Sequence, residues 1–293
     1  MDLSQLIQLL ISGIAIGSIY ALIALAFSLT VRSLNVINFA QGDLFMLGAY
    51  GAIAFYLLWG FPFWLAIILS TVSVALVGIA FERIAYRPLW KAHHVFLLMS
   101  TQGTAIVLQN AVMLIWGTDA WRFPKIFSDK VLDLAGIRVP VEMIWICLLA
   151  VFIMIIFNIF LKKTRLGKGF RAAAQDRETA VLMGVNLSIA DSFTFGASAG
   201  LGAVGGVLIA PVLFVTPYIG LIFTAKGFAA AVLGGLGSFR GAILGGFLLG
   251  ILENLVTAFI SSVYKDVLAF MLLILILIVK PSGLLLKPTV SKV

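Results

Sequence analysis

Long apolar runs separated by short polar segments make up almost the whole chain. Residues 3–31 contain no charged side chain, and about 20 apolar residues suffice to cross the roughly 30 Å hydrocarbon core of a bilayer. This run is too long for the core of a signal peptide and no basic segment precedes it, so we expect a retained first membrane span. Between Arg32 and Glu82 the only charge is Asp43, and a turn signal at residues 60–62 divides the segment into two further spans.

The later apolar runs predict the remaining spans. Three of them are uncharged and bounded by polar residues: 95–116, 143–161 and 267–279. Residues 192–225 are rich in glycine and alanine, which is typical of a helix packed closely inside a bundle, and we expect one span there. Residues 226–264 are interrupted by Arg240 and Glu253, and their first apolar piece is too short to cross a bilayer. This pattern predicts a broken or re-entrant helix, which is tolerated only inside protein or beside water.

The pattern therefore predicts an all-α polytopic membrane protein with eight or nine hydrophobic segments, forming a single transmembrane domain over residues 1–293. Composition agrees, because 62% of the residues are hydrophobic and 11% are charged, whereas about a quarter of the residues in soluble proteins are charged. Lys and Arg predominate in residues 82–94 and 162–191, which the positive-inside rule assigns to the cytoplasm. The mixed charges of residues 117–142 suit an external loop, so we expect an external N-terminus and a cytoplasmic C-terminus.

Two segments resemble each other in character. Residues 35–51 and 227–250 are both short hydrophobic stretches interrupted by glycine and polar side chains. Paired broken segments in the two halves of a chain point to an inverted-repeat transporter whose path lies where they meet.

The longest polar stretch, residues 162–191, contains the signals of a short helix. Asp176 can accept hydrogen bonds from the first-turn amides, and Gly184 can take the left-handed conformation that ends a helix. The residues that share one side of this helix are Thr179, Leu182 and Met183. Because about seven helical residues are unstable alone in water, we expect docking in a groove of a partner. A simple connection between two spans is the alternative.

Asp43 and Glu253 are predicted to lie within the membrane. A charged side chain at the centre of a spanning helix costs about 2.5–3.5 kcal/mol on insertion scales, so each should face protein or water. One interpretation makes them part of a gate or path, or proton sites. The other, which we favour, is a structural hydrogen bond near a helix end, with Asn35, Asn38 or Asn254 as the partner.

Signals of enzymatic chemistry are missing from the sequence. His93 and His94 are the only histidines, no HExxH or CxxC spacing occurs, and we expect no metal site. The phosphate-binding motif G-x-x-x-x-G-K-[ST] is also missing, so ATP would have to be bound by another chain and no cofactor is expected here. The net charge of +8 could suggest nucleic-acid binding. Most of the cations, however, lie in segments beside spans, where membrane orientation explains them, so we expect no nucleic-acid partner.

Several stretches resemble a known family. Residues 178–184, ETAVLMG, resemble the E-A-A-x-x-x-G element in cytoplasmic loops of ABC importer permeases, and RAAAQDRETAVLMGVN is similar to the corresponding loop of the branched-chain amino-acid permeases. Four further similar stretches follow the family's order: NVINFAQGDLFMLGAY, YRPLW, AAVLGGLGSFRGAILGG and KPSGLL. The likeness is closest to the LivH-type subunits. Two positions depart from it, since Thr179 replaces an alanine and Gln41 stands where many relatives have histidine.

The resemblance implies a permease subunit that carries branched-chain or similar apolar amino acids across the bacterial inner membrane, surrounded by lipid. It also implies a related second permease, two cytoplasmic ATPase subunits and a periplasmic binding protein as partners. The residues expected to couple to the ATPases are Arg171, Asp176, Glu178, Thr179, Ala180, Leu182, Met183 and Gly184. The candidates for the path or a gate are Asn38, Gln41, Asp43 and Glu253.

Two alternatives remain open from the sequence. Related ABC permeases for urea or short amides share much of this pattern. A proton- or ion-coupled secondary transporter that uses Asp43 and Glu253 belongs to a different class, and uptake by such a protein would stop when the membrane potential is collapsed at constant ATP.

Overall fold

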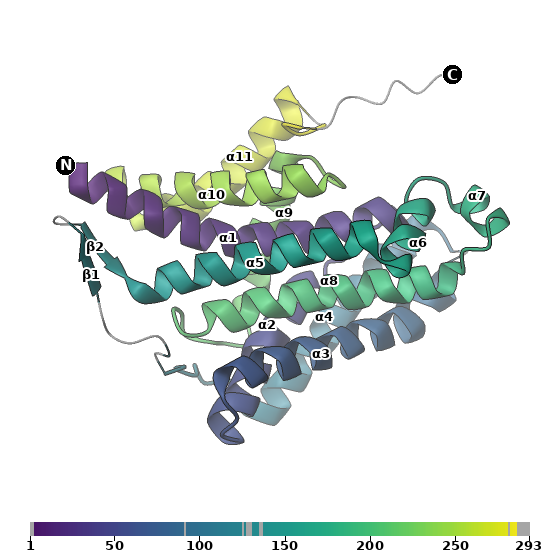
Figure 1. Cartoon of the computed structure of the whole chain (residues 1–293), viewed down its shortest axis with the longest axis horizontal. Coiled ribbons are helices and arrows are strands. Elements are labelled where there is room, and N and C mark those ends of the chain that lie inside the picture. The colour runs from purple at the N-terminus through teal and green to yellow at the C-terminus, as the bar shows by residue number, and fades with distance from the viewer. Residues whose placement is uncertain are drawn as a thin grey trace.

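A computed structural model describes residues 3–90, 92–124, 126, 131–134, 137–280 and 282–285. Helices dominate it (Figure 1). The α-helices are α1 (Leu3–Leu34), α2 (Gln41–Ala52), α3 (Phe63–Phe81), α4 (His94–Trp116), α5 (Val141–Lys163), α6 (Arg165–Ala173), α7 (Arg177–Leu182), α8 (Leu187–Ile209), α9 (Ile219–Gly234), α10 (Phe239–Phe259) and α11 (Lys265–Val279). The strands β1 (Val131–Leu134) and β2 (Ile137–Pro140) form an antiparallel hairpin within the segment predicted as an external loop.

Seven helical segments of the described chain are long and apolar enough to cross a membrane: Ser4–Leu34, Gln41–Leu58, Phe63–Leu89, His94–Trp116, Val141–Lys163, Leu187–Ile209 and Phe239–Phe259. The 16-residue α9 and the 15-residue α11 are apolar but shorter. These segments confirm the all-α membrane class with eight or nine hydrophobic segments. Two of the long segments continue beyond their α-helix. π-Helical turns, which are wider, follow α2 and α3, and the α3 segment ends in a tighter 3-10 turn at Arg87–Leu89. Sidedness stays a prediction, and residues 286–293 of the predicted C-terminal tail lie outside the described residues.

The predicted single span at residues 192–225 is wrong. α8 ends at Ile209, and α9 begins only at Ile219 after a connection that contains Pro211 and Pro217. Proline cannot donate a helical hydrogen bond and clashes with the preceding turn, so the uncharged run is divided there.

The segment 226–264 is broken, as predicted, but at a different place. Lys226 lies inside α9 and is buried, whereas α10 is a continuous 21-residue helix. The break falls at residues 235–238, between the two helices.

The chain has two halves whose equivalent helices run in opposite directions. α1 and α8 are antiparallel, since Ala26 lies against Ser198 and Ser33 against Thr194, and Figure 1 shows them running in opposite directions. α1 packs extensively along α10, and α8 packs in the same way along α3. α9 lies against α1 as α2 lies against α8. This is an inverted-repeat arrangement, in which the equivalent of α2 is α9 rather than the predicted segment 227–250.

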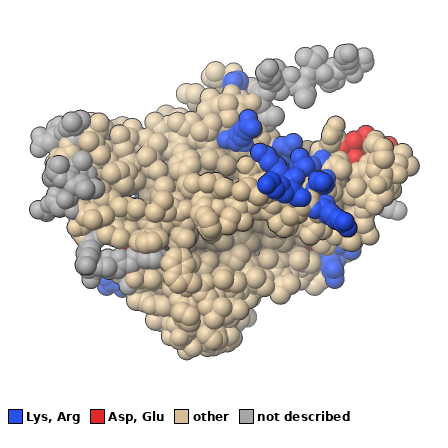
Figure 2. Space-filling model, viewed as in Figure 1, with Lys and Arg blue, Asp and Glu red and all other residues tan. Residues whose placement is uncertain are grey.

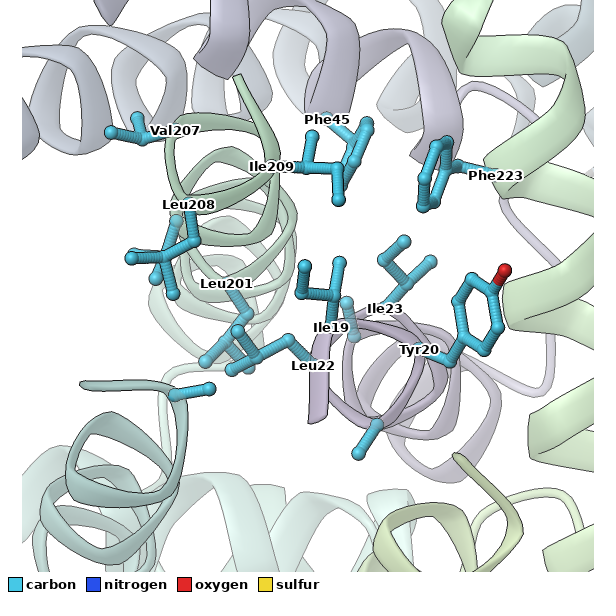
Figure 3. Close-up of a cluster of buried hydrophobic side chains, with 14 of the residues drawn as sticks. Ile19, Tyr20, Leu22, Ile23, Phe45, Leu201, Val207, Leu208, Ile209 and Phe223 are labelled. Carbon is cyan, nitrogen blue, oxygen red and sulfur yellow. The ribbon is translucent and has the colours of Figure 1, made fainter. Parts of the chain in front are cut away.

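The helices α2 and α9 cross near their N-termini inside the bundle. The backbones of Gly42 and Gly220 approach so closely that a Cβ atom on either residue would collide with the other helix. Just beyond this crossing, the rings of Phe45 and Phe223 stack with centroids 4.4 Å apart. Ile19 and Tyr20 of α1 belong to the same core (Figure 3). The crossing therefore lies beside the main hydrophobic core of the molecule.

Candidate functional site

The short helix α7 is capped as the sequence predicts. Asp176 Oδ1 accepts hydrogen bonds from the amides of Glu178 and Thr179, at 3.0 and 3.1 Å. The Thr179 hydroxyl donates to Asp176 Oδ2 at 2.7 Å. These bonds, with the hydroxyl first, hold the pKa of Asp176 below its ordinary value. Gly184 follows the helix with φ +81, the left-handed conformation of a helix end.

One face of α7 is apolar and points away from the rest of the chain. Leu182 and Met183 are 86% and 80% exposed, and the neighbouring Val181 is half exposed. Ala180, another of the predicted coupling residues, is buried. It packs against the chain's own helices and so is not available to a partner. Figure 1 shows α7 projecting from one end of the bundle. An exposed apolar face on a short polar connection fits a docking surface.

Arg177 anchors this helix to the membrane-spanning part of the protein. Its guanidinium donates to both carboxylate oxygens of Asp191, at 2.8 and 3.1 Å, and to the Ser33 carbonyl oxygen at 2.9 Å. It also lies 4.2 Å from the ring centroid of Trp90. α7 is thereby joined to the end of α1, to α8 and to the residue that follows the α3 segment. Sequence reasoning missed this role because the partners lie 14 and 144 residues away along the chain.

A second buried network continues along α8. Arg87 donates two hydrogen bonds to Glu82, at 2.9 and 2.8 Å, and the Ser192 hydroxyl donates to the same carboxylate at 2.9 Å. Glu82 is therefore fully satisfied although it is buried. The α3 segment and α8 are fastened together just beside the Arg177 anchor.

The helix α6 was not predicted. Its N-cap is Thr164, whose hydroxyl accepts from the Gly167 amide at 3.0 Å, and Phe170 buries its ring against Phe193 and Phe239. Arg171 lies on its exposed side and donates to the Lys162 carbonyl oxygen at 3.3 Å. Figure 2 shows Lys and Arg side chains gathered at the end of the molecule that carries α6. The predicted coupling segment is thus a pair of helices.

Glu253 lies in a buried ionic cluster inside the bundle. It accepts from the Tyr20 hydroxyl at 2.7 Å and pairs with Lys226 at 2.6 Å, and Lys226 also pairs with Asp266 at 2.8 Å. The suggested partner Asn254 instead donates to a backbone carbonyl oxygen of its own helix. The partners of Glu253 thus come from α1 and α9, and α11 joins the cluster through Lys226. The role of Glu253 stays a prediction.

The polar residues around the start of α2 differ in their partners. The Gln41 amide donates to the Ser198 carbonyl oxygen at 3.0 Å and accepts from the Ser198 hydroxyl at 2.7 Å. Asn38 accepts from the Ala40 amide at 3.1 Å and so shapes the turn into α2. Asp43, in contrast, lines a cavity of about 230 Å³ between α2, α4 and α9. Asp43 and Glu253 share no partner among the described residues, so the structure does not bring the two carboxylates together.

Metal ligands do not converge in the described ranges, where no three His, Cys, Asp or Glu side chains lie close enough to hold an ion.

Comparison with known proteins gives a consistent result. Residues 9–277 match the family model described as branched-chain amino acid transport system / permease component. The chain is 37% identical to the high-affinity branched-chain amino acid transport system permease protein LivH of Escherichia coli strain K12, over 98% of this chain and 97% of that protein. It is 35% identical to the permease protein BraD of Pseudomonas aeruginosa, over 100% and 99%. Among solved structures, a chain of PsaBC from Streptococcus pneumoniae in complex with Fab has a TM-score of 0.52 and 13% identity, covering 94% of this chain and 91% of that one. The last likeness concerns the fold alone.

Proposed function

This chain belongs to the family of branched-chain amino acid transport system permease components, and from that premise we propose that it is the membrane-spanning subunit of an ABC importer. It carries branched-chain or similar apolar amino acids across the inner membrane, and separate ATPase subunits hydrolyse the ATP. The named systems of its relatives favour this function over transport of urea or short amides and over proton-coupled transport.

The observation that supports this mechanism best is the combination of an exposed apolar face and a buried anchor on α7. Leu182 and Met183 offer a contact to an ATPase, while Arg177 fastens the same helix to α1 and α8. When the ATPases close, displacement of α7 is passed directly to two spans that belong to opposite halves. Coupling of this kind requires that both sites bias one element with two states.

The finer assignments extend this proposal. The whole chain acts as one transmembrane domain, with residues 162–191 as the cytoplasmic coupling loop. Two ATPases, a related second permease and a periplasmic binding protein complete the transporter. Asn38 and Gln41 shape the start of α2, Asp43 lies on the path, and Glu253 stabilises the bundle because Lys226 balances its charge.

The test is uptake of radiolabelled leucine by proteoliposomes that contain the chain together with its ATPase, second permease and binding-protein partners. We expect uptake to require ATP on the side of the membrane that carries the ATPase subunits. It should persist when the membrane potential is collapsed. Met183→Asp should abolish uptake because a charge cannot enter an apolar contact, whereas Met183→Leu should retain it. Uptake that follows the potential instead of ATP would refute the proposal.

A further inference from the structure

The cavity beside the crossing of α2 and α9 has a mixed lining. Its volume is about 230 Å³, which is below the roughly 300–1,000 Å³ of pockets for drug-sized ligands. One side presents the carboxylate of Asp43 and the amides of Gln102 and Gln109. The remaining surface is mainly apolar and includes Phe39, Ile106, Leu221 and Phe228. A molecule of the size of one amino acid, polar at one end and apolar at the other, fits this lining.

The face of α4 that borders the cavity is unsuited to lipid. Gln102 and Gln109 are seven residues apart and so lie on one side of a membrane-length helix. Within the part of the chain that the structure describes, neither side-chain amide has a hydrogen-bond partner. Amide groups facing hydrocarbon would stay unsatisfied, at considerable cost. This face therefore borders water, a passing solute or another subunit.

Asp43 supplies the negative charge of the cavity. Asp43 is only 8% exposed; its carboxylate accepts a hydrogen bond from its own backbone amide, and no ion pair to it is found among the described residues. Glu253 provides the contrast, because Lys226 and Tyr20 satisfy it. A carboxylate removed from water is stable only with a partner. Among the described residues that line this cavity none is a cation, so a ligand with a positive charge would supply the counter-charge that Asp43 lacks within the chain.

We propose that this cavity binds the transported amino acid, with the substrate's ammonium group against Asp43 and its apolar side chain against Phe39, Leu221 and Phe228. The inference rests on the proposed function and adds a substrate site to it. The lining comes from both halves of the inverted repeat, α2 and α4 on one side and α9 on the other. A change in the crossing of α2 and α9 would therefore open or close the site.

The test uses a single reporter cysteine in the assembled transporter. Cys147 is the only native cysteine, so Ala225→Cys, at a lining residue outside the proposed substrate contacts, gives one thiol at the cavity wall in a Cys147→Ser background. Its labelling by a maleimide is timed with leucine, with 3-methylbutylamine, which lacks the carboxylate, and with 4-methylpentanoate, which lacks the ammonium group. We expect the first two to slow labelling roughly tenfold at about ten times their dissociation constants. We expect 4-methylpentanoate to have no effect.

Matched variants identify the carboxylate that is responsible. Asp43→Asn should remove the protection by leucine and by the amine, whereas Asp119→Asn, the same change in an exposed loop, should leave it intact. Equal protection in Asp43→Asn, protection by 4-methylpentanoate, or equal protection by sodium or potassium ions would overturn the inference. Leucine uptake is measured separately in the same preparations. ATP-driven uptake by the wild type without ammonium-dependent protection refutes only the substrate site, and protection without ATP-driven uptake refutes only the proposed function.

Discussion

The anchor at Arg177 allows the coupling mechanism to be tested quantitatively. Arg177→Ala removes two hydrogen bonds to Asp191, one to the Ser33 carbonyl oxygen and the stacking on Trp90. The side chains of Arg177 and Asp191 are 23% and 11% exposed. Breaking a buried ion pair by removing one partner costs about 3–5 kcal/mol, and we take the lower value because water reaches part of the pair. At about 1.4 kcal/mol per factor of ten, the equilibrium constant for docking of α7 should fall roughly a hundredfold.

The assay is the ratio of leucine imported to ATP hydrolysed in proteoliposomes. Arg177→Ala should lower leucine uptake while ATP hydrolysis continues, because the ATPases keep working but α7 no longer moves α1 and α8 together. The ratio of leucine imported to ATP hydrolysed should therefore fall in proportion to uptake. Arg177→Lys keeps the charge without the planar fork, so its ratio should be intermediate. Arg83→Ala removes an exposed arginine that has no described contact and serves as the matched control.

A ratio in Arg177→Ala equal to that of the wild type would refute the mechanism. A second check is the double variant with Asp191→Asn. Since both changes break the same contact, their effects should not add. Additive effects would mean that the two residues act separately.

Three other predictions concern the short helix and the buried cluster. Gly184→Val should lower uptake without loss of the protein from the membrane, because a left-handed backbone costs an ordinary residue roughly 1–2 kcal/mol. Gly169→Ala is the control, since a Cβ atom there meets only an ordinary contact with Val185, and normal uptake in Gly184→Val would contradict the prediction. Lys226→Met should destabilise the detergent-solubilised protein by about 3–5 kcal/mol, seen as a lower melting temperature, because two carboxylates lose their cation. Adding Glu253→Gln should restore much of the lost stability. An unchanged melting temperature in Lys226→Met would contradict the role of the cluster. Asp176 has a lowered pKa in the folded chain, so the stabilisation of α7 by this cap should be fully present above the ordinary pKa of about 3.9 and be lost as pH falls through the lower folded pKa. Amide exchange at Glu178 and Thr179, corrected for the intrinsic pH dependence of exchange, reports the loss of the cap. The same pH dependence in Asp176→Asn would contradict the prediction.

Local signals carried most of the successful sequence predictions. The cap at Asp176 and the end at Gly184 depend on neighbouring residues only, and the structure has both. The span limits of α4 and α5 follow from polar residues at both ends of an apolar run, and they are met within two residues.

The sequence predictions failed where partners are distant in the chain. Lys226 looked like the boundary of a span, because its partners Glu253 and Asp266 lie 27 and 40 positions further on. The division between α8 and α9 carries no charge at all, and two prolines were its only signal. The anchoring role of Arg177 depends on Ser33, which no local pattern connects with it.

The inverted arrangement of the two halves has an energetic consequence. If the halves exchanged their conformations, the bundle would open toward the opposite side with the same kinds of helix contact. The halves are chemically unequal, however, since α9 carries Lys226 within an ionic cluster and α2 begins with the unpaired Asp43. We therefore expect the two conformations to differ in energy, so that one of them is the resting state in the absence of ATP and substrate.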